Sequence, residues 1–160
     1  MSFNKIYQAN RKIISFEFFP PKLEERLDDT LKLIEELAQL NPGLMTVTYG
    51  AGGGTRSLTN SIVSFIANKL QIPALAHITC AGHSVDEIDE IMDKLAAEGI
   101  NYVLALRGDP PKGSTHFVPH EHGLSSARDL VAHLKRNFNF SIAVAGYPDI
   151  HREAKSRTAD

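Results

Sequence analysis

The sequence has one cysteine, no segment long and apolar enough to span a membrane, and no large excess of charge of one sign. Cys80 stands alone, which excludes a disulfide framework and any paired-cysteine metal or redox motif. The net charge is -2 and no basic stripe recurs along one face, so we expect no nucleic-acid partner. Met1 to Lys12 are polar and lack the apolar core of a signal peptide. We therefore expect a cytoplasmic protein without a membrane partner.

The residues that are present fit one folded domain. Hydrophobic residues make up 42% of the chain and charged residues 22%, a balance that excludes wholesale disorder. A chain of 160 residues is long enough to bury a core, and neither a linker nor a low-complexity segment divides it. We predict a single domain over residues 1–160.

Apolar, β-branched runs alternate with amphipathic stretches along the chain. Their intervals of roughly 30 residues predict strand–helix–strand units and therefore a parallel sheet. Ser84 and Glu87 have the spacing of a capping box, and Gly99 can end the same helix. We predict strands at Lys12–Phe19, Leu44–Tyr49, Ala74–Cys80, Tyr102–Arg107 and Ser141–Tyr147. We predict helices at Leu23–Leu40, Leu58–Leu70, Val85–Glu98 and Ala127–Phe138.

Each predicted strand has one apolar face and one face that becomes polar toward its carboxyl end. Residues two apart on a strand share a face. The apolar pairs, which we expect to face the helices, are Met45/Val47, Ala76/Ile78, Leu104/Leu106 and Ile142/Val144. The opposite face carries Ser15/Glu17, Thr46/Thr48, His77/Thr79, Ala105/Arg107 and Ala145/Tyr147.

Two arrangements accommodate five parallel strands, namely a doubly wound sheet and part of an eight-stranded barrel. A doubly wound sheet usually gathers functional residues at one switch point, whereas a barrel gathers them at the ends of all its strands. We therefore predict an α/β fold of the (β/α)8 TIM-barrel type. Eight units require about 240 residues, so the chain corresponds to a partial barrel truncated to about five β-strands and four helices.

Glu17 lies within the apolar run Ile13-Ile14-Ser15-Phe16-Glu17-Phe18-Phe19, which two prolines terminate. An ionised carboxylate is costly to bury unpaired, so we expect a buried strand in which this group retains its proton at a higher pH than a free glutamate. A glutamic acid that is protonated near neutral pH can act as a general acid. The alternative is a structural ion pair between Glu17 and a lysine or arginine.

Two loops that follow strands carry residues suited to ligands. The loop from Gly50 to Thr55 lacks the last glycine of a dinucleotide fingerprint and the lysine of a P-loop, so we interpret it as a loop that a ligand can approach closely. A simple sharp turn is the alternative. In the other loop, Arg107 suits a phosphate or carboxylate and Asp109 suits a positive charge. The alternative is an Arg107–Asp109 pair that braces the loop.

Histidines occur in two settings. His116, His120 and His122 lie in a loop with no helix to set their geometry, so we favour a solvated loop over a zinc site. His77 lies on the polar face of a predicted strand, where a core hydrogen bond and a ligand contact are equal alternatives. Cys80, at the end of that strand, is expected to be a small packing residue.

Taken together, these segments resemble the methylenetetrahydrofolate reductases, which are flavin-dependent barrel enzymes of one-carbon metabolism. The resemblance spans nearly the whole chain and a little over half of a family barrel. Its motifs occur in the order found in the family. They are Phe16-Glu17-Phe18-Phe19-Pro20-Pro21, Val47-Thr48-Tyr49-Gly50-Ala51, His77-Ile78-Thr79-Cys80, Ala105-Leu106-Arg107-Gly108-Asp109 and Tyr147-Pro148-x-x-His151.

The resemblance implies an oxidoreductase that binds FAD, takes reducing equivalents from NADH or NADPH, and reduces 5,10-methylenetetrahydrofolate to 5-methyltetrahydrofolate. Glu17 would be the general acid that helps to open the one-carbon bridge of the folate. Asp109 would stabilise the resulting cation, and both residues would contact the substrate. The implied FAD-binding residues are Thr48, Tyr49, Ala51, His77, Arg107, Gly108, Asp109, Ala127, Tyr147, His151, Ala154 and Asp160.

The resemblance also implies which molecules the protein binds, and its gaps leave other functions open. The implied partners are folate and nicotinamide small molecules, no metal is implied, and a full-length protein is expected to be a homo-oligomer. Ser126 stands where some bacterial members carry an aromatic residue, and the later strands that hold folate and nicotinamide in the family are absent. The chain could therefore be an incomplete part of the enzyme. Two alternatives stay open: a non-catalytic fragment that binds flavin or a partner, and a different barrel enzyme such as a metal-dependent hydrolase.

Overall fold

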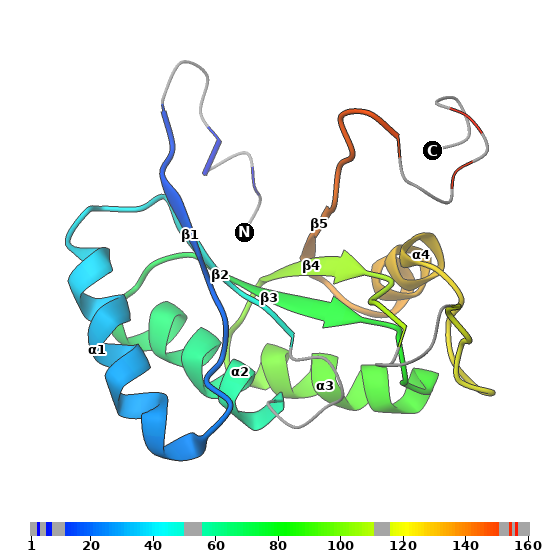
Figure 1. The fold of residues 1–160 in the computed structure, drawn as a ribbon, viewed down its shortest axis with the longest axis horizontal. Coiled ribbons are helices and arrows are strands. Elements are labelled where there is room, and N and C mark those ends of the chain that lie inside the picture. Colours follow the sequence, from blue (N-terminus) through cyan, green and yellow to red (C-terminus); the bar gives the residue numbers. More distant parts are fainter. Residues whose placement is uncertain are drawn as a thin grey trace.

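The computed structural model describes residues 3, 6–7, 12–49, 56–110, 116–150, 154 and 156. Within these residues, five strands alternate with four α-helices along the chain (Figure 1). The strands are β1 (Ser15–Phe18), β2 (Leu44–Val47), β3 (Ala74–Thr79), β4 (Tyr102–Leu106) and β5 (Ser141–Val144). The helices are α1 (Leu27–Ala38), α2 (Arg56–Ser64), α3 (Val85–Ala97) and α4 (Ala127–Asn137). Every predicted strand and helix is therefore confirmed: the helix predicted at Leu58–Leu70 continues from α2 into a π-helical turn at Phe65–Lys69, and the other elements differ by a few residues at their ends.

The five strands form one parallel sheet in the order β1-β2-β3-β4-β5. Each strand pairs with the next one along the chain, so that Glu17 lies opposite Thr46 and Ala76 lies opposite Val103. A doubly wound sheet reverses its strand order at a switch point, and the described strands contain no such reversal. The predicted parallel α/β fold is confirmed, and the doubly wound alternative is wrong.

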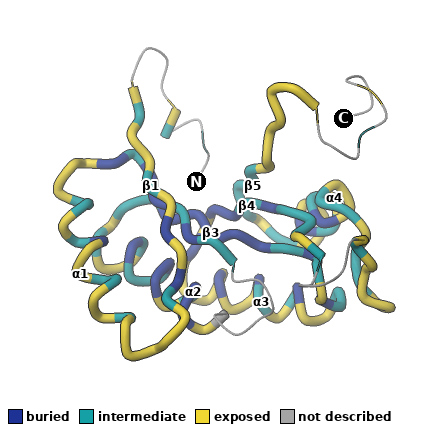
Figure 2. Tube along the Cα trace, viewed as in Figure 1, coloured by how far each residue is buried: buried dark blue, intermediate teal, exposed yellow. Residues whose placement is uncertain are grey.

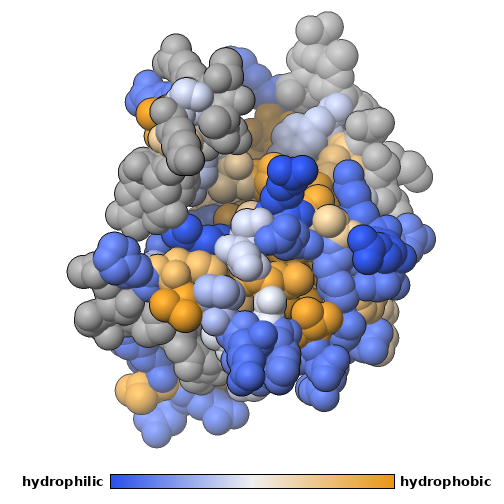
Figure 3. All heavy atoms as spheres, turned by 90° about the vertical axis from the view of Figure 1, so that its right-hand side faces the viewer, coloured by the Kyte–Doolittle hydropathy of each residue, from blue (hydrophilic) through white to orange (hydrophobic). Residues whose placement is uncertain are grey.

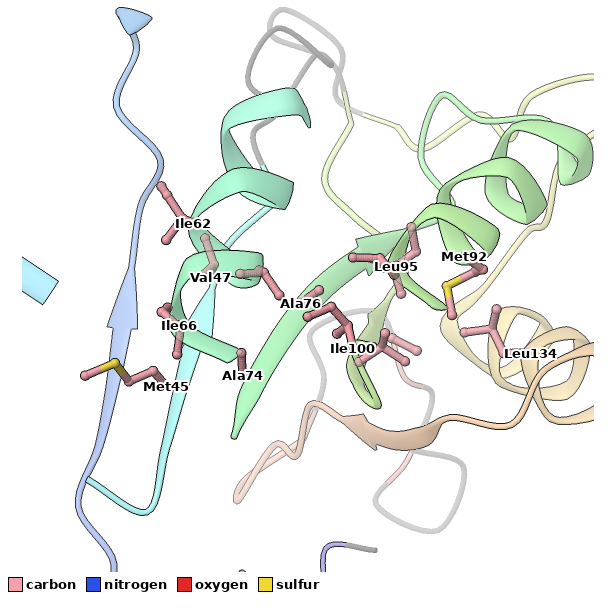
Figure 4. Close-up of a cluster of buried hydrophobic side chains, with 14 of the residues drawn as sticks. Met45, Val47, Ile62, Ile66, Ala74, Ala76, Met92, Leu95, Ile100 and Leu134 are labelled. Atoms are coloured by element: carbon pink, nitrogen blue, oxygen red, sulfur yellow. The ribbon is translucent and has the colours of Figure 1, made fainter. Parts of the chain in front are cut away.

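All four helices pack on one face of the sheet. Ile34 of α1, Ile62 of α2, Met92 of α3 and Leu134 of α4 belong to one buried cluster that also contains apolar side chains of the strands (Figure 4). Burying each such side chain stabilises the fold by about 1.5–3 kcal/mol. Burial is accordingly concentrated in the central strands and on the helix surfaces that face them (Figure 2).

Local sequence signals account for the helix boundaries. The Ser84 hydroxyl accepts a hydrogen bond from the Glu87 amide at 3.2 Å, and the Glu87 carboxylate accepts one from the Ser84 amide at 2.9 Å, which confirms the capping box. Gly99 follows α3 with a φ of 76°, a conformation that glycine adopts without strain. In contrast, the first helix does not begin at Leu23 as predicted. Leu23 precedes a 3-10 turn at Glu24–Arg26, and its side chain is exposed rather than packed in the core.

A second, smaller hydrophobic cluster lies on the face of the sheet that the helices do not cover. Leu44, Leu75 and Tyr102 are buried there, close to the amino ends of their strands. The ring of Phe3 packs against Tyr102 with 5.1 Å between ring centroids. These contacts fill the face at one end of the strands, and they leave the carboxyl ends for polar side chains.

The prediction for the faces of β4 is wrong. Leu104 packs with the second cluster, whereas Val103 and Ala105 pack with the core beneath the helices. The register agrees, because Ala105 lies opposite the buried Ile78 of β3. β4 is apolar on both faces, as strands of covered parallel sheets usually are, so alternation of polarity gave no signal there.

Among the described residues, no helix has the length and apolar character needed to cross a bilayer.

Candidate functional site

Polar side chains collect where the strands end. Because neighbouring strands are parallel, their carboxyl ends lie along the same edge of the sheet (Figure 1). Glu17 and His77 lie in β1 and β3, Arg107 and Asp109 directly follow β4, and Tyr147 follows β5. The parallel order therefore places these residues along one edge of the sheet.

Glu17 forms the best defined part of this region. Thr46 of β2 donates a hydrogen bond from Oγ1 to Glu17 Oε2 at 3.3 Å. His77 Nε2 lies 3.5 Å from the same carboxylate oxygen. The three residues share the face of the sheet that the helices leave uncovered, which confirms their predicted placement.

The expectation that Glu17 is buried is wrong. Its side chain is 51% exposed, and the groups beside it are a hydroxyl and an imidazole rather than a lysine or arginine. Among the described strands, β1 pairs only with β2, and no described strand covers its other edge. An acid role for Glu17 therefore has to depend on what binds beside it.

His77 is buried, with 7% of its surface exposed. Desolvation lowers the pKa of its imidazole below the usual 6.5, and the nearby Glu17 carboxylate opposes this shift only in part. The ring is therefore neutral at neutral pH. Its Nε2 atom is close to Glu17 but makes no hydrogen bond with any described residue. A buried nitrogen in this state suits a contact with a bound molecule.

Contacts with Phe117, Ala81 and Cys80 help to hold the start of the loop after β4. The Arg107 guanidinium lies over the ring of Phe117, with its central carbon 4.8 Å from the ring centroid. The Arg107 carbonyl accepts hydrogen bonds from the Ala81 amide at 2.9 Å and from the Cys80 thiol at 3.2 Å. Cys80 is buried, as predicted, and burial raises the pKa of its thiol. Sequence reasoning did not identify Phe117, because nothing in its loop indicates which cation it meets.

The segment after β2 is anchored from two sides. Thr59 of α2 donates a hydrogen bond to the Thr48 carbonyl at 3.2 Å. The Tyr49 ring packs edge-on against the buried His83 with 5.6 Å between centroids. His83 is a second buried imidazole that sequence reasoning missed, since it lies in a loop without a periodic pattern. These contacts fix the backbone that leads into the glycine-rich loop.

The described histidines of the loop after β4 do not converge. The His122 amide donates a hydrogen bond to His120 Nδ1 at 3.2 Å, so this imidazole nitrogen accepts a hydrogen bond from within the loop. No group of three suitable ligands is close enough to hold a metal ion in the part of the chain that the structure describes, which includes all three histidines. The zinc alternative therefore has no geometric support.

The other predicted cofactor-binding residues are less well defined. Tyr147 is exposed, and Ala127 is half-buried at the start of α4. Ser126, which departs from the family pattern, caps α4 by accepting a hydrogen bond from the Asp129 amide at 3.1 Å. Ala154 is half-buried. Ala51, His151 and Asp160 lie outside the described residues.

A groove of about 660 Å³ is lined by residues of α1 and of the segment that precedes this helix. The apolar residues of its lining are Pro21, Leu23 and Leu33, and the polar ones are Lys22, Arg26, Asp29 and Thr30. Its lining includes no histidine or cysteine and none of the three residues that meet around Glu17 Oε2. We therefore assign the candidate site to the carboxyl ends of the strands.

Comparison with known proteins points to one family. The family model for methylenetetrahydrofolate reductase matches residues 2–160. The chain is 41% identical over 147 residues to the 5,10-methylenetetrahydrofolate reductase of Escherichia coli K12, covering 92% of this chain and 48% of that protein. It is 39% identical over 159 residues to a probable methylenetetrahydrofolate reductase (NADH) of Oryza sativa subsp. japonica, covering 96% of this chain and 27% of that protein.

The chain thus spans about half the length of this bacterial relative and about a quarter of the plant one. The match to the family model nevertheless includes all the strands and helices described above. The chain belongs to the methylenetetrahydrofolate reductase family.

Proposed function

We propose that this chain provides the acid and cofactor-binding part of a methylenetetrahydrofolate reductase that converts 5,10-methylenetetrahydrofolate to 5-methyltetrahydrofolate. The observation that supports this most directly is the convergence of Glu17, Thr46 and His77 in a chain of this family. Plant relatives are named for NADH, which favours NADH over NADPH as the reductant.

We further propose that the sheet is a segment of a (β/α)8 barrel. Its strands follow one another in sequential order, and all four helices lie on one face. In a barrel the uncovered face becomes the interior, and catalytic residues lie at the carboxyl ends of the strands. The positions of Glu17 and His77 agree with both requirements.

The described residues fit FAD as the cofactor. His77 offers a buried nitrogen without a hydrogen-bond partner among them, and Arg107 is held in place by Phe117. Thr48, His77, Arg107 and Tyr147 would hold the cofactor, with the arginine suited to its phosphates. When bound, FAD would supply the carrier that passes a hydride from NADH to the folate.

Glu17 would supply a proton in this reaction. A bound substrate would exclude water from the carboxyl group, and loss of water favours the neutral, proton-carrying form of such a group. Transfer of that proton to a folate nitrogen breaks the O–H bond, forms an N–H bond and opens the one-carbon bridge. The Asp109 carboxylate would then stabilise the cationic product of this step.

A FAD titration followed by absorption and fluorescence tests the cofactor assignment. We expect one FAD per chain, with binding weakened at least tenfold by His77→Ala and by Arg107→Ala. Lys135→Ala, on the exposed surface of α4, serves as the control and should not change FAD binding. Failure of the wild-type chain to bind FAD, or equal binding by all three variants, would contradict the assignment.

Glu17→Gln separates the two half-reactions. The variant should lose at least 100-fold in folate reduction, as expected when a general acid is removed. Flavin reduction by NADH should be unchanged, because it does not use the Glu17 proton. If folate reduction survives in the variant, Glu17 is not the acid. If the wild-type chain binds FAD but reduces no folate, the chain is a flavin-binding fragment.

A further inference from the structure

Thr46 is the residue of the candidate site whose contact with Glu17 is best defined. It lies directly opposite Glu17 in the β1–β2 register, and its hydroxyl donates to Oε2 at 3.3 Å. Threonine is β-branched and stiff about χ1, so a strand position holds its hydroxyl in a narrow range of directions. His77 Nε2 lies 3.5 Å from the same oxygen. Thr46 and His77 therefore both lie beside the same oxygen, Oε2, of the Glu17 carboxyl group.

The other oxygen is in a different situation. Within the described part of the chain, no hydrogen bond or ion pair involves Glu17 Oε1. The Thr46 hydroxyl can donate to Oε2 whether or not Oε1 carries a proton, because Oε2 is an acceptor in both states. The contact therefore does not have to break when the proton leaves.

We propose that Thr46 is a positioning residue that turns the carboxyl group of Glu17 so that Oε1 carries the proton and delivers it to the substrate. This inference rests on the proposed function. In the step itself, the Oε1–H bond of Glu17 breaks, an N–H bond forms on the folate, and Glu17 is left as a carboxylate. Thr46 keeps its own proton throughout.

The geometric part of the proposal is tested by NMR on the 160-residue chain, without cofactor or substrate. Three-bond coupling constants report whether the χ1 and χ2 angles of Glu17 are fixed or averaged. We expect fixed angles in the wild type and in Thr46→Ser, and averaged angles in Thr46→Val. Glu90, an exposed glutamate of α3, is the internal reference for an averaged side chain. Equal averaging of Glu17 in the wild type and in Thr46→Val would overturn the proposal.

The chemical part is tested by the two half-reactions. Thr46→Val keeps the shape and strand propensity of threonine but lacks the hydroxyl. Losing one hydrogen bond of this kind should slow folate reduction about fivefold. Thr46→Ser should restore the rate to within about twofold, and flavin reduction by NADH should be the same in all three proteins. If Thr46 only stabilised the fold, Thr46→Val would slow both half-reactions. Thr46→Ser would then not restore folate reduction alone.

The outcomes separate this inference from the proposed function. If the wild-type chain reduces no folate, the proposed function fails, and the coupling constants still decide whether Thr46 orients Glu17. If the wild type is active and Thr46→Val is equally active, the proposed function stands and the positioning role is overturned.

Discussion

Glu17 and His77 differ sharply in exposure although their side chains lie 3.5 Å apart. Glu17 is 51% exposed and His77 is 7% exposed. The difference follows from their strands, because β1 is at the edge of the sheet and β3 is between β2 and β4. Sequence patterns predict which residues share a face, but they do not reveal which strand lies at an edge. The burial of Glu17 was mispredicted for this reason.

The pKa of His77 should lie below 6.5 in the folded chain, because desolvation outweighs the opposing effect of Glu17. Glu17→Gln removes the carboxylate that raises this pKa, so the variant should show a still lower value. An NMR titration of the imidazole resonances measures both, with the urea-unfolded chain as the reference. A value at or above that reference in the wild type would contradict the prediction.

This shift also links stability to pH. The unfolded chain takes up a proton on His77 near pH 6.5, whereas the folded chain does so only at lower pH. The free energy of unfolding should therefore fall as the pH drops from 6.5 toward the lower folded value, and His77→Gln should reduce this loss. Urea unfolding at a series of pH values would detect the difference.

Gly108 adopts a φ of 89°, and a Cβ atom there would lie 2.7 Å from the Ala81 side chain. Gly108→Ala should therefore combine backbone strain with a steric clash, and lower the free energy of unfolding by about 1–3 kcal/mol. Gly99→Ala is the matched control, since Gly99 has a φ of 76° with nothing within 4 Å of the added atom. Chemical denaturation should show a larger loss at Gly108, and equal losses would rule out the clash.

At the scale of the elements, local signals were sufficient for the helices. The Ser84 capping box and Gly99 define α3, and both are observed as predicted. The faces of β4 were mispredicted because residues such as Leu104 and Ala105 are all apolar, and because Arg107, the polar residue that suggested the face, lies beyond the end of the strand at Leu106. Strand faces become clear only when the partner strand and its register are known.

Ser84→Ala removes the hydroxyl that caps α3 and should lower the free energy of unfolding by about 1 kcal/mol. Ser61→Ala provides the comparison, because Ser61 is exposed within α2 and its hydroxyl only bonds back to the Ser57 carbonyl. That change should alter stability by less than about 0.5 kcal/mol. Equal urea midpoints for the two variants would show that the cap contributes little.

At the scale of the whole molecule, the parallel order of the strands was predictable because each strand–helix–strand unit repeats the same pattern. The distribution of polar and apolar side chains over the surface was not predictable from the sequence. On the side of the molecule that carries α4, hydrophilic side chains surround smaller hydrophobic areas (Figure 3). β1 and β5 each pair with one described strand, and the exposed Val144 lies at the end of β5. An uncovered strand edge presents backbone N–H and C=O groups with which another chain can pair.

Val144→Lys should therefore reduce self-association of the 160-residue chain. Val144 is 59% exposed on an edge strand, where a lysine opposes pairing with another strand by adding charge. Val118→Lys makes the same chemical change at a residue that is 74% exposed in a loop, so it controls for net charge. Sedimentation velocity over a range of concentrations should show less association for Val144→Lys than for Val118→Lys. If both variants associate like the wild type, the β5 edge is not the contact; if both associate equally less, net charge rather than the edge governs association.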